Sequence, residues 1–177
     1  MALLREGGWD QLSVAEVAAR AGVHETSIYR RWRTREGLMI DALLTSGSQE
    51  LPIPDTGSLR GDLIAFATEL STFLADPLGR ALEHALATPT VDPATIEASA
   101  RYFRMRFEIA SVIIKRASDR GEIPVCADPS LALEMLIAPV HVRTLLTHQP
   151  IDDQFPSRLA DMLIHGLQAR THATLRS

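Results

Sequence analysis

Four arginines lie close together near the start of this sequence, and their type and spacing suggest a contact with phosphate. They alternate with aromatic and hydroxyl side chains in the run Tyr29, Arg30, Arg31, Trp32, Arg33, Thr34 and Arg35. Arginine carries a permanent, planar, forked charge that matches phosphate oxygens, and hydroxyl groups add hydrogen bonds to the same backbone. A charge run is often only a solvated face, so that simpler interpretation stays open here.

The positive charge is local, because the chain as a whole is acidic. The 177 residues carry 18 basic and 22 acidic side chains, a net charge of −4. Residues 1–40 contain six arginines against five acidic residues, so the negative balance belongs to the remainder. This distribution argues against indiscriminate binding of nucleic acid, but it permits a cationic patch on one face.

Two short helices are expected to position the arginines. Ser13 and Glu16 have the spacing of a capping box, and Gly22 suits the left-handed residue that ends a helix. The first helix has one apolar stripe, formed by Val14, Val17, Ala18 and Ala21. The first helix is therefore predicted between Ser13 and Gly22.

A second helix is predicted to start at His24 or Glu25 and to run through Trp32. Val23, Ile28 and Trp32 have the spacing to face the first helix. The outward side then consists of Glu25, Thr26, Ser27, Tyr29, Arg30 and Arg31. Two short helices joined by a glycine-containing turn match the helix-turn-helix that enters a DNA groove, although an ordinary helical hairpin has the same spacing.

The string A-G-V-x-x-x-S-I-Y-R-R-W-x-T-R-E-x-L at Ala21–Leu38 resembles the N-terminal domain of the tetracycline-repressor (TetR) family of bacterial transcription regulators. It is similar to the subgroup that has Tyr-Arg-Arg-Trp where others have Tyr-x-His-Phe. The resemblance implies a homodimer whose paired recognition helices read a palindromic operator. It also implies a C-terminal domain that binds a small molecule and then lowers the affinity for DNA.

One feature departs from that family pattern. Family members usually have a complete first helix before the two described above, whereas Met1–Gly8 supplies only its last turns. We therefore expect the start of that helix to be missing from this sequence. Leu3, Leu4 and Trp9 are expected to be its remaining contribution to the small N-terminal core.

Residue roles in the DNA-reading helix follow from geometry and then from the resemblance. The first turn enters a groove deepest, so Glu25 and Thr26 are predicted to read bases, and Arg30 to reach a guanine or a phosphate. The resemblance implies that Ser27, Tyr29, Arg31 and Arg35 touch the DNA backbone. The full predicted DNA-binding set is Glu25, Thr26, Ser27, Tyr29, Arg30, Arg31, Arg33, Thr34 and Arg35.

The rest of the chain predicts an all-α fold, because apolar residues recur at helical spacing and no long period-two alternation occurs. Helices are expected at about 35–46, 58–75, 77–87, 93–120, 129–148 and 155–171. Pro139 should kink the fifth of these near residues 136–138. The loop after residue 46 predicts a DNA-binding domain at 1–46 and an effector-binding and dimerisation domain at 47–177.

The last two helices carry apolar stripes that core packing and dimerisation explain about equally well. The stripes are Leu131, Met135, Val140 and Leu145 on one helix, and Leu159, Met162, Leu163 and Leu167 on the other. The resemblance favours a homodimer through these helices. A mainly apolar effector cavity, for which plain core packing is the competing explanation, is predicted among Phe66, Phe73, Phe103, Phe107, Met135 and His141.

Other classes of function find little support in the sequence. Enzyme motifs such as a nucleophile elbow, a glycine-rich phosphate loop or HExxH are absent, so no enzyme and no cofactor are expected. His141 and His148 lie seven apart, which does not fit a metal pair on one helix, and no metal is expected. The apolar runs are short and there is a single cysteine, which favours a cytoplasmic protein without a membrane span. The main rival is a small-molecule-binding module of TetR shape that lacks operator recognition.

Overall fold

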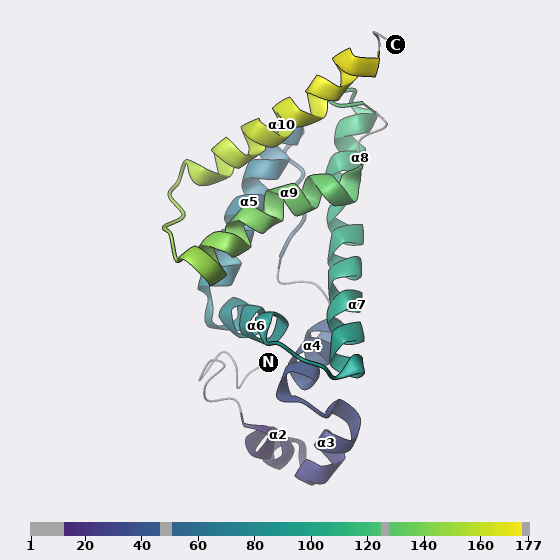
Figure 1. The fold of residues 1–177 in the computed structure, drawn as a ribbon, viewed down its shortest axis with the longest axis vertical. Coiled ribbons are helices and arrows are strands. Elements are labelled where there is room, and N and C mark those ends of the chain that lie inside the picture. Colours follow the sequence, from purple (N-terminus) through teal and green to yellow (C-terminus); the bar gives the residue numbers. More distant parts are fainter. Residues whose placement is uncertain (1–12, 47–50, 125–127, 175–177) are drawn as a thin grey trace. The chain divides into compact units, whose positions relative to one another are not determined.

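The computed structural model describes residues 13–46, 51–124 and 128–174, and every regular element within these ranges is a helix (Figure 1). This confirms the predicted all-α fold class for the described part of the chain. The helices are α2 (Val14–Ala21), α3 (Glu25–Trp32), α4 (Arg35–Ser46), α5 (Leu59–Ala75), α6 (Pro77–Ala87), α7 (Pro93–Ala110), α8 (Val112–Asp119), α9 (Pro129–His141), the π-helix η1 (Val142–Thr147) and α10 (Phe155–Thr174). The predictions for Leu3, Leu4 and Trp9 lie outside the described residues.

The chain packs as two compact units. The N-terminal unit combines residues 1–50 with 73–105, and the C-terminal unit combines residues 51–72 with 106–177. Packing therefore groups α6 and the first part of α7 with the predicted DNA-reading helices.

The signals that define α2 are all present in the structure. The Oγ atom of Ser13 accepts a hydrogen bond from the backbone N–H of Glu16 at 3.0 Å. Gly22 has a φ of 65° and ends the helix in the left-handed conformation, where a Cβ would be strained. His24 takes the cap position of α3, and its side chain makes no capping hydrogen bond. The predicted bounds of both helices are confirmed.

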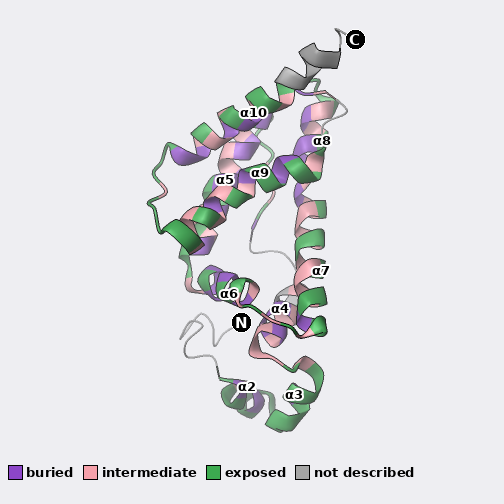
Figure 2. Cartoon of the chain, viewed as in Figure 1, coloured by how far each residue is buried: buried purple, intermediate pink, exposed green. Residues whose placement is uncertain are grey.

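Two small apolar clusters hold the N-terminal unit together. The first joins α2 to α3 through buried Val14, Ala18 and Ile28. The second joins α4 to α6 and consists of Met39, Ile40, Leu78, Ala81, Leu82 and Ala85. Helix α4 packs on both α3 and α6, so its position in this unit affects where α3 lies (Figure 2).

The C-terminal unit is built around α9, which packs against both α8 and α10. Its buried side chains include Leu63, Phe66, Ile113, Leu133, Leu136, Val140 and Leu163. Burying one such side chain stabilises a fold by about 1.5–3 kcal/mol. An exposed ion pair between Arg60 and Asp161, at 2.7 Å, also links α5 to α10.

Two predicted helices are interrupted. The predicted helix at 93–120 is divided at Ser111 into α7 and α8, which still ends where expected, at Gly121 with a φ of 76°. The predicted helix at 129–148 continues through Pro139 and then widens into η1. The irregular stretch thus follows Pro139 instead of preceding it, in a π-helix whose wider turn changes the backbone hydrogen-bonding pattern.

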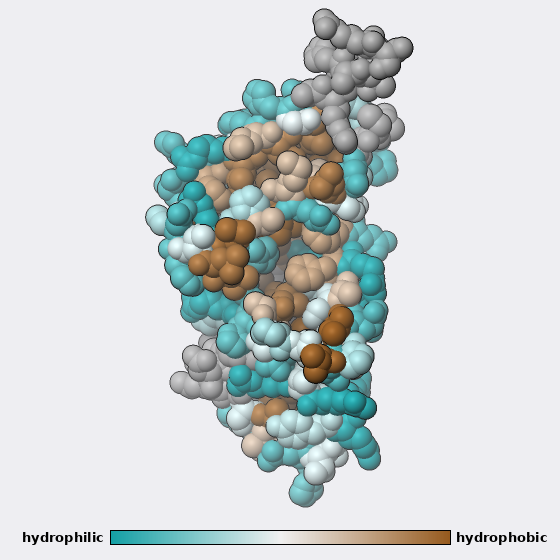
Figure 3. All heavy atoms as spheres, in the orientation of Figure 1, coloured by the Kyte–Doolittle hydropathy of each residue, from teal (hydrophilic) through white to brown (hydrophobic). Residues whose placement is uncertain are grey.

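Helices α9 and α10, with η1, also present apolar side chains to solvent, as the brown surface over this region in Figure 3 shows. The exposed members are Leu131, Met135, Val142, Leu146 and Met162. Within the described residues, the segment Pro129–Thr147 is also the one helix long and apolar enough to cross a membrane by length and composition. The same property is common in core helices of proteins without any membrane span.

Candidate DNA-binding surface

Helix α3 separates one buried residue from a polar outer face. Ile28 is 4% exposed and packs in the cluster with α2. The outer face of the first two turns consists of exposed Glu25, Thr26, Ser27, Tyr29 and Arg30. Tyr29 is 48% exposed, which is unusual for a large aromatic side chain and keeps its ring and hydroxyl available to a partner. The structure therefore leaves all five of these predicted residues exposed on α3.

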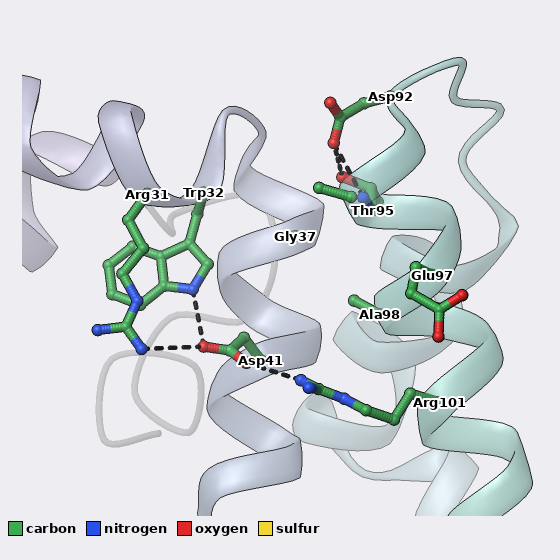
Figure 4. A pocket seen from close by; sticks show the side chains of 10 residues that line it. Arg31, Trp32, Gly37, Asp41, Asp92, Thr95, Glu97, Ala98 and Arg101 are labelled. Carbon is green, nitrogen blue, oxygen red and sulfur yellow. Dashed lines mark hydrogen bonds and ion pairs between the residues drawn. The ribbon is translucent and has the colours of Figure 1, made fainter.

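Arg31 and Trp32 end α3 and both turn toward Asp41 of α4 (Figure 4). The Nε1–H of Trp32 donates to Oδ2 of Asp41 at 2.8 Å, and a guanidinium nitrogen of Arg31 lies 3.9 Å from the same oxygen. The Arg31 guanidinium also lies over the Trp32 ring, 4.6 Å from its centroid. Arg31 thus has contacts within the protein, although its side chain remains 70% exposed.

The three remaining predicted residues lie around the turn between α3 and α4. Arg33 is exposed at the end of α3. Thr34 is half-buried, and its hydroxyl oxygen accepts a hydrogen bond from the backbone N–H of Gly37 at 2.9 Å. Arg35 is half-buried at the start of α4. The hydroxyl of Thr34 therefore has a structural role at the beginning of α4.

Sequence reasoning missed the residues of α7 that meet this turn. The hydroxyl of buried Thr95 lies 2.9 Å from that of Thr34 and donates to Oδ2 of Asp92 at 2.8 Å. Hydrogen bonds from the hydroxyl and the backbone N–H of Thr95 lower the pKa of Asp92, and the charge of Arg33 lowers this pKa further. Arg101 donates to Oδ1 of Asp41 at 3.1 Å. These residues are about 60 positions from the turn, and no local pattern links them.

A hollow of about 340 Å³ lies between these two sets of contacts. Its lining comes from α3, α4 and α7 and consists of Arg31, Trp32, Gly37, Asp41, Asp92, Ala94, Thr95, Glu97, Ala98 and Arg101. All of these residues belong to the N-terminal unit, and Figure 4 shows that Asp41 and Thr95 lie on different sides of the hollow. The end of α3 therefore lies beside α7 with a hollow between them.

The residues predicted for an effector cavity fall in both compact units. Phe73 and Phe103 belong to the N-terminal unit, where the Phe103 ring meets Tyr102 edge to face. In the C-terminal unit Phe66 is buried and Met135 is 55% exposed, while Phe107 and His141 are half-buried. Within the described residues, no group of three or more His, Cys, Asp or Glu side chains is arranged to hold a metal ion. The effector cavity stays a prediction.

Comparison with known families assigns both parts of the chain. Residues 1–42 match the family described as bacterial regulatory proteins, tetR family, and residues 53–163 match the tetracyclin repressor-like C-terminal domain. The chain belongs to the TetR family. Helices α2 and α3 therefore lie within the segment that matches the tetR family.

Individual TetR-family relatives agree with this assignment. The chain is 38% identical to the HTH-type transcriptional regulator AqdR of Rhodococcus erythropolis, over 99% of this chain and 87% of the relative. It is 33% identical to the DNA-binding transcriptional repressor TetR of Mycobacteroides abscessus, over 90% of this chain and 84% of the relative. The crystal structure of the TetR family transcription regulator SCO0332 superposes with a TM-score of 0.79 at 28% identity, over 93% and 92% of the two chains. The protein is a helix-turn-helix transcriptional regulator.

Proposed function

We propose that this TetR-family regulator binds a palindromic operator as a homodimer, and that a small-molecule effector lowers its affinity for that operator. The observation that carries the proposal is the outer face of α3. Five side chains able to contact DNA are exposed there, while Ile28 anchors the helix to α2. An α-helix with such a face fits the major groove, where base edges and phosphates are both within reach.

The exposed side chains divide by position along α3. Glu25 and Thr26 stand in the first turn and are proposed to read bases, through a cytosine amino group and a thymine methyl group respectively. Ser27, Tyr29 and Arg30 are exposed on the following turn and are proposed to contact the backbone, with Arg30 also able to reach a guanine. Arg31, Arg33, Thr34 and Arg35 are proposed as phosphate contacts at the end of the helix and the following turn.

The homodimer is proposed to form through α9, η1 and α10. Met135 is 55% exposed and Met162 is 75% exposed, and exposed Leu131, Val142 and Leu146 extend the apolar surface. Large contiguous apolar surfaces on proteins in water mark interaction sites. A homodimer also suits the DNA, because two recognition helices about 34–36 Å apart reach successive faces of the major groove.

The proposed roles are divided between the N-terminal and the C-terminal part of the chain. Residues 1–46 bind DNA, and residues 47–177 bind the effector and form the dimer. A mainly apolar effector shifts the equilibrium between two arrangements of the C-terminal domain, and α4 transmits the change to α3, with which it packs. The protein acts in the cytoplasm, with no membrane, cofactor or catalytic activity in the proposal.

The test is selection of bound DNA from a random pool of duplexes by the purified protein, followed by sequencing. The expected result is one enriched palindrome whose half-site centres lie about 10–11 base pairs apart or a multiple of that spacing. Enrichment of no sequence over the starting pool would contradict operator recognition and support the rival, a TetR-shaped module that does not read DNA.

A further inference from the structure

Asp41 of α4 contacts three separate side chains in the N-terminal unit. Its Oδ2 accepts the N–H of Trp32 at 2.8 Å and lies 3.9 Å from Arg31, and its Oδ1 accepts from Arg101 of α7 at 3.1 Å. We propose that Asp41 is a positioning residue for DNA recognition. Through these contacts it fixes the end of α3 and orients the Arg31 side chain. The inference rests on the proposed operator binding and identifies a residue for it that does not itself touch DNA.

Because Asp41 is partly buried, its carboxylate depends on the hydrogen bonds that it accepts. The Asp41 side chain is 23% exposed, whereas its two arginine partners are 56% and 70% exposed. A partly dehydrated carboxylate depends on its hydrogen-bond donors more than a fully hydrated one does. Since Arg101 supplies a second positive charge, Arg31 can leave Asp41 for a phosphate without stranding the carboxylate. Asp41 therefore keeps its bond to Trp32 both before and after DNA binds.

The hollow beside Asp41 gives polar contacts a share in setting the orientation of the end of α3. Where side chains interlock closely, apolar packing fixes the angle between helices. Here about 340 Å³ is unfilled where α3 and α4 meet α7. Trp32 packs on the cluster between α2 and α3, and polar contacts in addition link the end of α3 to α7 on both sides, from Trp32 through Asp41 to Arg101 and from Thr34 to Thr95.

A change at Asp41 should therefore alter selectivity for the operator more than affinity for DNA in general. Bases are read only when the helix lies at the correct angle, whereas any phosphate attracts a cation. Removing the Asp41 charge also reduces repulsion of every duplex. The ratio of operator affinity to non-specific affinity is therefore the quantity that should fall.

The experiment measures that ratio for Asp41→Asn and Asp41→Ala, using the selected operator and a scrambled duplex of the same length, well below the unfolding temperature. Asp41→Asn keeps an acceptor for Trp32 and should lower the ratio about 3-fold, and Asp41→Ala should lower it at least about 10-fold. The control Asp119→Asn removes the same charge from an ion pair with Lys115 on α8 of the C-terminal unit, and it should leave the ratio unchanged. Trp32→Phe combined with Asp41→Ala should lower the ratio by less than the product of the two single effects, because both remove the same hydrogen bond.

A wild-type ratio in both Asp41 variants would overturn the inference. Equal losses of operator and scrambled-duplex affinity, in step with a loss of folded protein, would also overturn it, because Asp41 would then only stabilise the fold. Should Asp41→Ala fail to fold, the ratio of Asp41→Asn decides between these results. Failure of the wild-type protein to prefer any sequence would instead refute the proposed function.

Discussion

The recognition helix α3 and the pair α9–α10 both leave a face uncovered within one chain, and the two faces have opposite chemistry. Helix α3 exposes hydroxyl, carboxylate and guanidinium groups around Tyr29. Helices α9 and α10 expose Leu131, Met135 and Met162. The first face suits a charged polymer with polar base edges, and the second suits another apolar surface. We therefore expect the chemistry of each uncovered face, more than the extent of its exposure, to indicate its partner.

The largest predicted effect comes from making the α9–α10 face charged. Met135→Glu combined with Met162→Glu should separate the dimer, because carboxylates would be buried against an apolar partner. A monomer reaches one half-site only, so affinity for the palindrome should fall by about 1,000-fold or more. Analytical ultracentrifugation and operator titration measure the two effects. Ile96→Glu, at an exposed apolar position of α7 in the N-terminal unit, is the matched control and should leave the dimer intact.

The second prediction removes side chains from the α3 face. Tyr29→Ala combined with Arg30→Ala should lower operator affinity about 100-fold, since each side chain contributes a contact in both half-sites. The dimer should persist, because neither residue lies on α9 or α10. Operator titration at fixed salt gives the first quantity and ultracentrifugation the second. Unchanged operator affinity would show that DNA meets some other surface.

The third prediction concerns the turn that supports α3. A Cβ at Gly37 would lie 3.0 Å from the hydroxyl oxygens of both Thr34 and Thr95, so Gly37→Ala crowds their hydrogen bond. It should lower the free energy of unfolding by about 1–3 kcal/mol. At Gly166, in α10, nothing lies within 4 Å of the added Cβ, and Gly166→Ala should stabilise the protein by about 0.5–1 kcal/mol. Denaturant unfolding at one protein concentration compares the two.

The smallest predicted effect depends on pH. Hydrogen bonds from Thr95 hold the pKa of Asp92 below its ordinary value of 3.8. The resulting stabilisation is complete above that value, and it is lost as the pH falls through the lower pKa of the folded state. Asp92→Asn should therefore lower the free energy of unfolding slightly at pH 7, and its difference from the wild-type protein should shrink as the pH falls below about 4. If the free energy of unfolding of the variant fell as steeply below pH 4 as that of the wild-type protein, the Asp92 contacts would contribute nothing to stability.

Local signals were sufficient to predict the DNA-reading elements. Ser13, Gly22 and the apolar spacing set the bounds of α2 and α3, because caps and turns depend on residues a few positions apart. The outward face of α3 followed from the same spacing. Pro139 was recognised as a disturbance, but no local signal predicted the π-helix that follows it.

Contacts between distant residues could not be predicted in the same way. The contact of Asp41 with Arg101 joins residues 60 positions apart. It makes Asp41 a polar link between α4 and α7, which the helical spacing of α4 did not predict. The apolar stripes on the last two helices contain both core residues and exposed residues. Helical periodicity alone could not tell the two apart. Val140 and Leu163 proved to be buried in the core, whereas Met135 and Met162 are exposed. Only the packing of the rest of the chain decides which part of a stripe remains uncovered.

The most direct test of the account is a salt titration of operator binding that compares the selected palindrome with the same duplex after one half-site is scrambled. The account predicts that the palindrome binds at least about 100-fold more tightly at moderate salt, and that both affinities fall steeply as salt rises. Equal affinity for the two duplexes at every salt concentration would contradict the claim that two copies of α3 read the operator together.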